Sequence, residues 1–122
     1  MTTTTTSTDD LANIPHPPGA TRVHEWFNDD QPPGAVVNHV NAETRRYFLG
    51  TSRRVSCPDV PNITVSIDGY QHADGHAVRY IVVDTVHTDN PLPPDLARSL
   101  IAACTAAADE VDKMASRDVT IA

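Results

Sequence analysis

The sequence predicts an α+β domain in which a small antiparallel sheet, of three to four strands, packs one face against a single long C-terminal helix. Two observations support this prediction. Apolar and polar residues alternate on both sides of a turn at residues 73–75, which is the pattern of a β-hairpin with one buried face. An apolar stripe with helical spacing then extends from Leu96 to Met114.

The 122 residues fit one domain, which we place at residues 22–115. Residues 1–21 are rich in threonine and proline and hold few apolar side chains. Because so little apolar surface cannot offset the entropy of ordering a chain, we expect residues 1–21 to be a disordered tail. Residues 116–122 are expected to fray.

In the first part of the domain, the sequence pattern indicates strands less clearly than it does in the hairpin. Trp26 and Phe27 are expected to anchor the N-terminal arm on the core, and the Asp/Pro/Gly-rich residues after them form a loop. A short strand is expected at 35–40, and strands are expected on either side of Gly50, chiefly at 53–57. Pro58 and Pro61 then interrupt the pairing and mark a turn.

The register of the hairpin follows from its loop. A three-residue loop at 73–75 places Val65 opposite Val83, whereas a two-residue loop places Val65 opposite Asp84. A slip of one residue moves every side chain to the other face, so the three-residue loop is the consistent choice. It also puts Gly75 at the left-handed position that glycine favours.

In this register the second face of the hairpin is too apolar to be simply solvated. Either the N-terminal arm with Trp26 covers this face, or a second subunit does. The candidate interaction face therefore comprises Tyr70, Val78, Tyr80, Val82 and Trp26.

The C-terminal helix has clear signals at both ends. Pro94 suits the first helical turn, and Asp95 and Lys113 complement the helix dipole near the N- and C-terminus. The residues that should face the sheet are Leu96, Leu100, Ala103, Ala107, Val111 and Met114.

The overall charge narrows the classes of partner. A net charge of −7 argues against a general affinity for nucleic acid or anionic membranes. No apolar run approaches the roughly 20 residues that span a bilayer, and the first ten residues lack the features of a secretory signal. We predict a cytoplasmic protein without a cofactor, with an unknown protein or a second copy of itself as partner.

Arg45, Arg46, Arg53 and Arg54 form the single basic patch of the sequence, with Tyr47 and Phe48 between the two doublets. Guanidinium groups and aromatic rings together could contact phosphates and stack bases. A solvated sheet edge, or an acidic patch on a partner protein, accounts for the arginines equally well.

His72 and His76 would face each other across the hairpin, and Asp74 lies between them. Structural zinc sites have four ligands and catalytic sites usually have three protein ligands, so these two histidines are only weak candidates and we predict no metal site. Cys57 and Cys104 form no Cys-x-x-Cys motif. They are expected to be free thiols, with a disulfide only if the protein is exported.

The sequence contains no nucleophile elbow and no glycine-rich phosphate loop. We therefore predict that the protein is not an enzyme. The leading hypothesis is a protein-interaction or regulatory module, with a homodimer as one form of it. The alternatives are a nucleic-acid or acidic-partner binder that uses the arginine doublets, and a metal-binding or enzymatic site at the hairpin histidines.

Three segments of the sequence form a distinctive order. They are Trp26 with the aspartates after it, the hairpin with Val-Ser-Ile at 65–67, Gln71 and Asp-Gly at 74–75, and the helix with Leu-Pro-Pro-Asp-Leu-Ala-Arg at 92–98 and Ala-Ala-Ala-Asp-Glu-Val-Asp at 106–112. Together they resemble a family of small uncharacterised actinobacterial proteins. In that family a tryptophan segment precedes a β-hairpin and a helix that reads like L-T-P-x-x-A-R-x-L.

The resemblance covers residues 22–115 and implies the same fold and a bacterial source, but no activity. This chain departs from the family at the tryptophan segment. Arg22 and Phe27 stand where cysteines often occur, and Asp30 is not followed by histidine. If those cysteines and that histidine bind a metal in relatives, this chain lacks the site.

Overall fold

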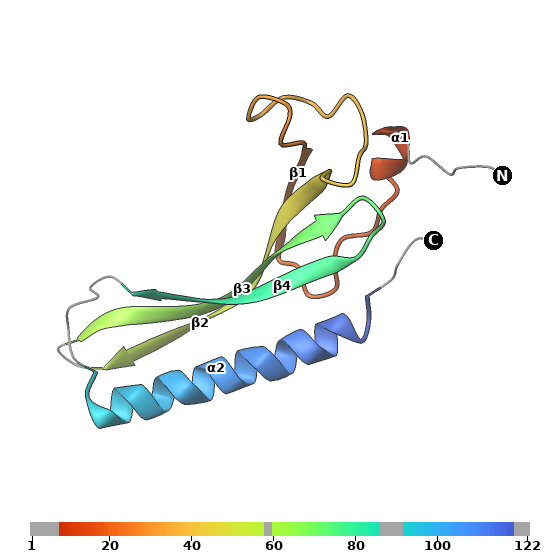
Figure 1. Cartoon of the computed structure of the whole chain (residues 1–122). Helices are drawn as coiled ribbons and strands as arrows, with labels where there is room; N and C mark the ends of the chain where they lie inside the picture. Colours follow the sequence, from red (N-terminus) through yellow and green to blue (C-terminus); the bar gives the residue numbers. More distant parts are fainter. Residues whose placement is uncertain (1–7, 58–59, 86–91, 119–122) are drawn as a thin grey trace.

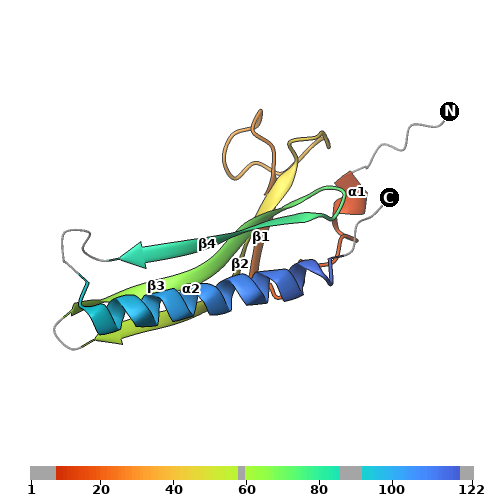
Figure 2. The ribbon, with the colours of Figure 1, turned by 60° about the horizontal axis from the view of Figure 1, so that its bottom comes forward.

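The computed structural model describes residues 8–57, 60–85 and 92–118. Its elements are α1 (Thr8–Leu11), β1 (Arg22–Phe27), β2 (Arg45–Cys57), β3 (Val60–His72), β4 (Ala77–Thr85) and α2 (Pro94–Ala115). The strands form one antiparallel sheet in the order β1-β2-β3-β4, and α2 lies along one face of it (Figures 1 and 2). The predicted α+β class is confirmed, with four strands. Within the described ranges, neither helix is long and apolar enough to cross a membrane.

The hairpin of β3 and β4 has the predicted register. Val65 is paired with Val83, and the loop closes with hydrogen bonds of 2.9 Å from the His72 N–H to the His76 carbonyl and from the Gly75 N–H to the His72 carbonyl. Gly75 has φ = 96°, the left-handed conformation that the three-residue loop requires. The alternation of apolar residues therefore correctly identified which side chains share a face.

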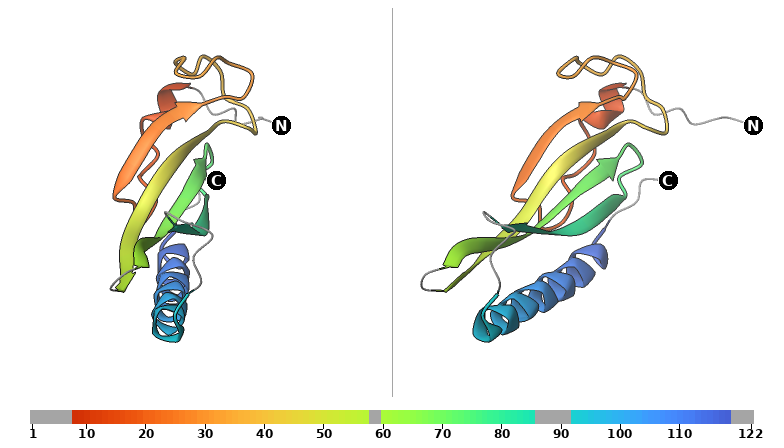
Figure 3. Two further views of the ribbon diagram at one scale, coloured as in Figure 1. Left: turned by 90° about the vertical axis from the view of Figure 1, so that its left-hand side faces the viewer. Right: turned by 60° about the vertical axis from the view of Figure 1, so that its left-hand side comes forward.

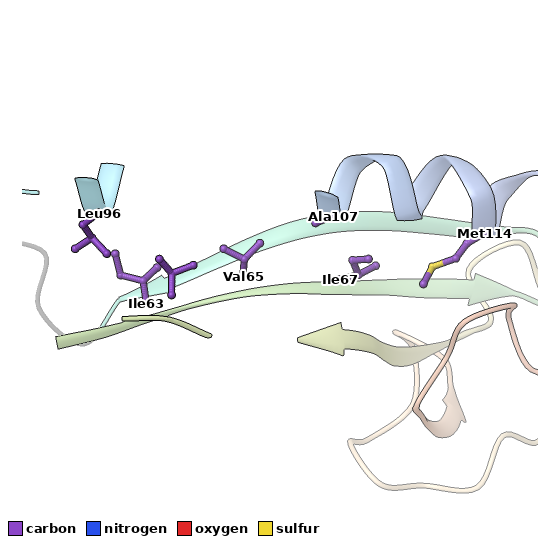
Figure 4. Packing of buried hydrophobic residues seen from close by; sticks show 7 residues of the cluster. Ile63, Val65, Ile67, Leu96, Ala107 and Met114 are labelled. Atoms are coloured by element: carbon purple, nitrogen blue, oxygen red, sulfur yellow. The ribbon is translucent and has the colours of Figure 1, made fainter. Parts of the chain in front are cut away.

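The main core lies between β3 and α2. Figure 4 shows Ile63, Val65 and Ile67 beside Leu96, Ala107 and Met114 of the helix. All six side chains are buried, and the remaining members of the predicted helical stripe pack around them: Leu100, Ala103 and Val111.

The helix covers the fourth strand only partly. Ile81 and Val83 lie on the same face as Val65, yet they remain 38% and 44% exposed. The side chain of Glu110 shows why, because it reaches Thr51 on β2 and so places the helix over β2 and β3. The expectation that Ile81 and Val83 would be buried under the helix is therefore met only in part.

Residues 8–21 differ from the prediction of a disordered tail, because they pack on the helix-bearing face of the sheet. Leu11 and Ile14 are only 4% and 5% exposed. The 13 residues of β3 extend about 43 Å and the 22 residues of α2 about 33 Å. One helix is therefore too short to cover this face, and the N-terminal segment covers the remainder. Residues 1–7 lie outside the described residues.

The C-terminal end also differs from the predicted fraying. Asp118 pairs with Arg79 through two contacts of 2.7 Å, and the Arg79 side chain is 2% exposed. The ion pair fixes residues 116–118 against the sheet, while residues 119–122 lie outside the described part. The N-terminal segment meets the same region, because Gly19 with φ = 81° lies directly against Met114.

The predicted strand at 35–40 is wrong, whereas the strands predicted on either side of Gly50 are present as one continuous strand. Residues 35–40 form no strand but belong to an irregular loop between β1 and β2. The Asn28 side-chain amide holds this loop by donating to the Gln31 side chain at 2.9 Å and to the His39 carbonyl at 2.8 Å. The chain around Gly50 forms one strand, β2, with an irregularity between Leu49 and Ser52 in place of a break.

Gly69 makes room for the largest buried side chain of the sheet. Phe48 is fully buried and paired with Gly69 on β3. A Cβ atom at Gly69 would come within 2.2 Å of the Val78 carbonyl and 2.8 Å of the Phe48 ring. Only a glycine at this position lets the ring lie flat across the strand.

We expect the substitution Gly69→Ala to lower the free energy of unfolding by about 1–3 kcal/mol, the usual cost of forcing extra volume into a packed core. Ser52→Ala, an exposed change on the same sheet, should alter this energy by less than about 0.5 kcal/mol. Urea unfolding measures both. Equal stability of the two variants would show that the close approach at Gly69 is not required.

Candidate functional site

The sheet has one face that no described element covers. The helix α2 and residues 8–21 share one side, and the four strands are exposed on the other (Figures 1 and 3). We call this second side the open face. Its central residues are His24, Phe27, Arg45, Tyr47, Tyr70, Val78, Tyr80 and Val82.

Aromatic rings form a continuous row across β1, β2 and β3 of the open face. The ring centroids of His24 and Tyr47 are 5.3 Å apart, those of Tyr47 and Tyr70 are 5.5 Å apart, and those of Phe27 and Tyr70 are 6.5 Å apart. These separations and the tilted planes are typical of favourable aromatic pairs. Tyr80 on β4 lies on the same face, opposite Asp68, and is 53% exposed.

A hydrogen bond fixes the central tyrosine of the row. The Tyr47 hydroxyl donates to the Asp68 carboxylate at 2.7 Å. This bond, with burial adding to it, raises the pKa of Tyr47 to about 12. The phenol therefore stays neutral at physiological pH and keeps one orientation on the surface.

Arg45 lies beside the aromatic row on the open face. Its guanidinium is 4.7 Å from the Phe27 ring centroid and 5.5 Å from that of Tyr70. It also pairs with Asp29 through two contacts of 3.0 and 3.1 Å. The hydrogen bond to Asp29 raises the pKa of Arg45. Arg45 is thus held at the edge of the row by an acidic partner of its own chain.

Arg46 points to the opposite side and holds the N-terminal segment. Its Nε donates to the Gln71 side chain at 2.8 Å, and one Nη donates to the carbonyls of Ile14 at 3.1 Å and Pro15 at 3.3 Å. The guanidinium also lies 4.4 Å from the Trp26 ring centroid. Burial lowers the pKa of Arg46, although an arginine remains protonated in proteins.

This arrangement separates Trp26 from the other residues of the predicted interaction face. Trp26 pairs with Arg46 on β2 and lies on the covered side of the sheet. Tyr70, Val78, Tyr80 and Val82 share the open face, as predicted. Trp26 belongs to the anchoring of the N-terminal segment, because adjacent residues of a strand point to opposite faces and Phe27 occupies the open face.

The four arginines do not form one patch. Arg53 lies on the covered side, where it binds Glu110 of the helix at 2.8 Å. Arg54 is exposed on the open face and has no hydrogen-bond or ion-pair partner among the described residues. Arg45 and Arg54 share a face but lie toward opposite ends of β2, since they pair with His72 and Thr64 of β3.

His72 and His76 face each other, as expected, but as a stacked pair. Their ring centroids are 4.2 Å apart and the planes differ by 7°. Asp74 bonds to the His76 ring and backbone. No group of three or more potential ligands is found within residues 8–57, 60–85 and 92–118. Among the described residues, no ligand from another element joins the two imidazoles and the Asp74 carboxylate at this turn.

Of the two cysteines, the structure describes the side chain of Cys104 alone. Cys104 is free and half-buried in the flank of α2. The side chain of Cys57 lies outside the described residues.

Two clefts lie beside β1, and neither was predicted from the sequence. One holds about 500 Å³ between the N-terminal segment and the loop, and the other about 620 Å³ between β1 and the same loop. Glu25, Trp26, Gly34 and Ala35 line both clefts. Volumes of this size are typical of small-ligand pockets.

Sequence reasoning did not assign His24, Phe27, Tyr47 and Asp68 to the open face, nor Gln71 to the contact beneath Arg46. One available signal could have placed Tyr47. Arg45, Tyr47 and Leu49 alternate with Arg46 and Phe48, which assigns them to opposite faces once a strand is placed there.

Comparison of the chain with protein-family models, with curated proteins and with solved structures finds no match. The resemblance to the actinobacterial family around Trp26, the hairpin and the helix therefore stays a prediction.

We expect Arg46→Lys to release the N-terminal segment. Lysine keeps the charge but cannot bind Gln71 and two carbonyls with one planar group. The free energy of unfolding should fall by about 1–3 kcal/mol, the cost of leaving buried polar groups unpaired. Thermolysin should also cleave residues 8–21 faster.

Arg54→Lys is the matched control, since the same change at an exposed arginine should alter neither stability nor cleavage. Identical behaviour of the two variants would contradict a clamping role for Arg46.

A second prediction concerns pH. Burial, and the neighbouring charge of His76, lower the pKa of His72. The unfolded chain therefore takes up this proton more readily than the folded protein does, so stability is present above the ordinary histidine pKa of about 6.5 and is lost as the pH falls below it.

The free energy of unfolding should decrease between about pH 7.5 and 5.5, and His72→Gln should reduce this slope. Substitution of the exposed Ser99 by Gln, which removes no titratable group, provides the control and should leave the slope unchanged. An unaltered slope in the His72 variant would show that this imidazole does not contribute.

Proposed function

We propose that this protein is a non-enzymatic protein-interaction module of the cytoplasm, which binds a partner protein through the open face. The observation that supports the proposal is the aromatic row of Tyr47, Tyr70 and Phe27 on a sheet face that no described element covers. Tyrosine and phenylalanine are enriched in the buried centres of protein interfaces, where they contribute large apolar area.

The open face combines apolar contact area with a polar surround. Val78 and Val82 extend the apolar area along β4, next to Tyr80. Arg45 and Asp68 provide charged groups beside the rings, and each is already bonded to a group of this chain. The side chains therefore lose little freedom when a partner binds, which lowers the entropic cost of association.

The alternative functions have weaker geometric support. A binder of nucleic acid or of acidic partners would need its cations together, whereas the sheet directs Arg46 and Arg53 to one side and Arg45 and Arg54 to the other. Arg46 and Arg53 are also occupied by contacts within the fold. A metal or enzymatic site at His72 and His76 would need further ligands brought by another molecule.

The proposal predicts that Tyr70→Ala weakens partner binding by roughly tenfold or more, as truncation of a central interface aromatic does. Proteins captured from a native lysate with the wild type, and then purified, provide the ligand, and calorimetry measures its dissociation constant. Val36→Ala is the control, because Val36 is 88% exposed in the loop and lies away from the aromatic row.

Unchanged binding by the folded Tyr70 variant would contradict the proposal. Binding that instead weakens steeply with salt, and that is lost in Arg54→Ala, would support the basic alternative.

A further inference from the structure

The sheet ends on one side in an unprotected strand. β4 pairs with β3 alone, and no other described element pairs with its outer edge (Figure 3). The hydrogen bond from the His72 N–H to the His76 carbonyl sets the alternation of bonds along the hairpin. With the observed register, the N–H and C=O groups of Arg79, Ile81 and Val83 point away from β3.

Apolar side chains gather along this edge. Tyr80, Ile81, Val82 and Val83 are consecutive, and each is between 38% and 53% exposed. The side chains of four adjacent apolar residues are therefore partly exposed to water. Because side chains alternate along a strand, this exposure occurs on both faces of the sheet. Contiguous apolar surface of this kind marks an interaction site on a soluble protein.

The neighbouring flank of α2 continues the apolar surface. Glu110 reaches β2, so the opposite flank of the helix lies on the side of β4. Helical spacing places Ala97, Ile101, Cys104 and Ala108 on that flank. Ile101 is 66% exposed there, although it is one of the largest apolar residues of the helix.

The other edge of the sheet shows how this chain protects a strand that is not meant to pair. β1 has six residues, its register shifts between Val23 and Trp26, and it carries Arg22 and Glu25. Irregularities and charges are common means of blocking edge-to-edge association. β4 has nine residues in a continuous register. Its one cation, Arg79, is turned inward to Asp118.

We propose that β4 pairs antiparallel with β4 of a second copy of this chain, about a two-fold axis at Val82. In this register Ile81 of each copy lies opposite Val83 of the other, and their outward backbone groups complete the ladder. Tyr80 lies opposite Asp84 of the second copy, where its hydroxyl can donate to the carboxylate. The pattern is self-complementary, which is the requirement of a two-fold interface.

A second copy fits this edge better than a face-to-face dimer fits the open face. Stacking two open faces would remove the charged Asp68 and Arg54 of both copies from water, which is costly. Edge pairing instead satisfies free backbone groups, joins two four-stranded sheets and brings the exposed Ile101 flanks of the two helices toward the interface. The pairing does not depend on the partner protein proposed above, and it leaves both open faces accessible.

Sedimentation velocity over a range of concentrations tests the pairing. The wild type should form a dimer. Val83→Lys should remain monomeric at concentrations where the wild type is dimeric, because an edge lysine opposes strand pairing. Val36→Lys adds the same charge at an exposed loop residue and should dimerise like the wild type. Circular dichroism and the urea midpoint confirm that each variant is folded.

A cross-link tests the register. In a variant that lacks Cys57 and Cys104, Val82→Cys should form a disulfide between two copies under mild oxidation. The two Cα atoms would lie about 4.5 Å apart at a pair without backbone bonds, within the range of a disulfide. Ser66→Cys, on the neighbouring strand of the same face, should not cross-link.

Three results would overturn the proposal: a strict monomer at all concentrations, a dimer that persists in Val83→Lys, or cross-linking at residue 66 but not at residue 82. Loss of partner binding in Tyr70→Ala with an intact dimer would show that the open face binds the partner and is not needed for the dimer. Loss of the dimer in Val83→Lys with partner binding retained would show that the β4 edge forms the dimer and is not needed for the partner. Each proposal can therefore be contradicted without affecting the other.

Discussion

Burial of one complete face of a long twisted sheet is the constraint on which the other features of this structure depend. The helix α2 covers the half around Ile63 and Val65, and it ends before the half around Phe48. The N-terminal segment covers that second half, where the Arg46 guanidinium satisfies two of its carbonyl groups. A segment with so few apolar residues remains in place because the buried Arg46 guanidinium, which also lies over the Trp26 ring, donates hydrogen bonds to its carbonyl groups.

The same arrangement leaves two surfaces uncovered. With the helix and the N-terminal segment on one side, the other side of the sheet, which carries the tyrosines, is covered by no described element. Because the helix lies over β2 and β3, the fourth strand is also only partly covered. The two surfaces meet at Tyr80 and Val82. Pairing of two β4 strands would place two open faces side by side in one continuous sheet, and so double the area available to a partner.

Local patterns predicted the hairpin and the helix because each element repeats its own period within a few residues. The period of two around Val65 and Val83 was sufficient for the register, and the spacing from Leu96 to Met114 was sufficient for the buried stripe. The N-terminal segment was missed because its stabilising contacts come from far away in the chain. Ile14 and Arg46 are separated by 32 positions, and no local period reports their contact.

The sequence by itself determined which residues of the hairpin and the helix share a face, since side-chain direction follows directly from backbone periodicity. It also determined the left-handed turn at Gly75. Only the tertiary structure decided which face the N-terminal segment covers, and therefore that Trp26 lies on the covered side and Tyr70 on the open face. It also divided the arginines between the two sides of the sheet. The physical reason is that a strand alternates its side chains, whereas the choice of which side to bury depends on the elements that pack against it.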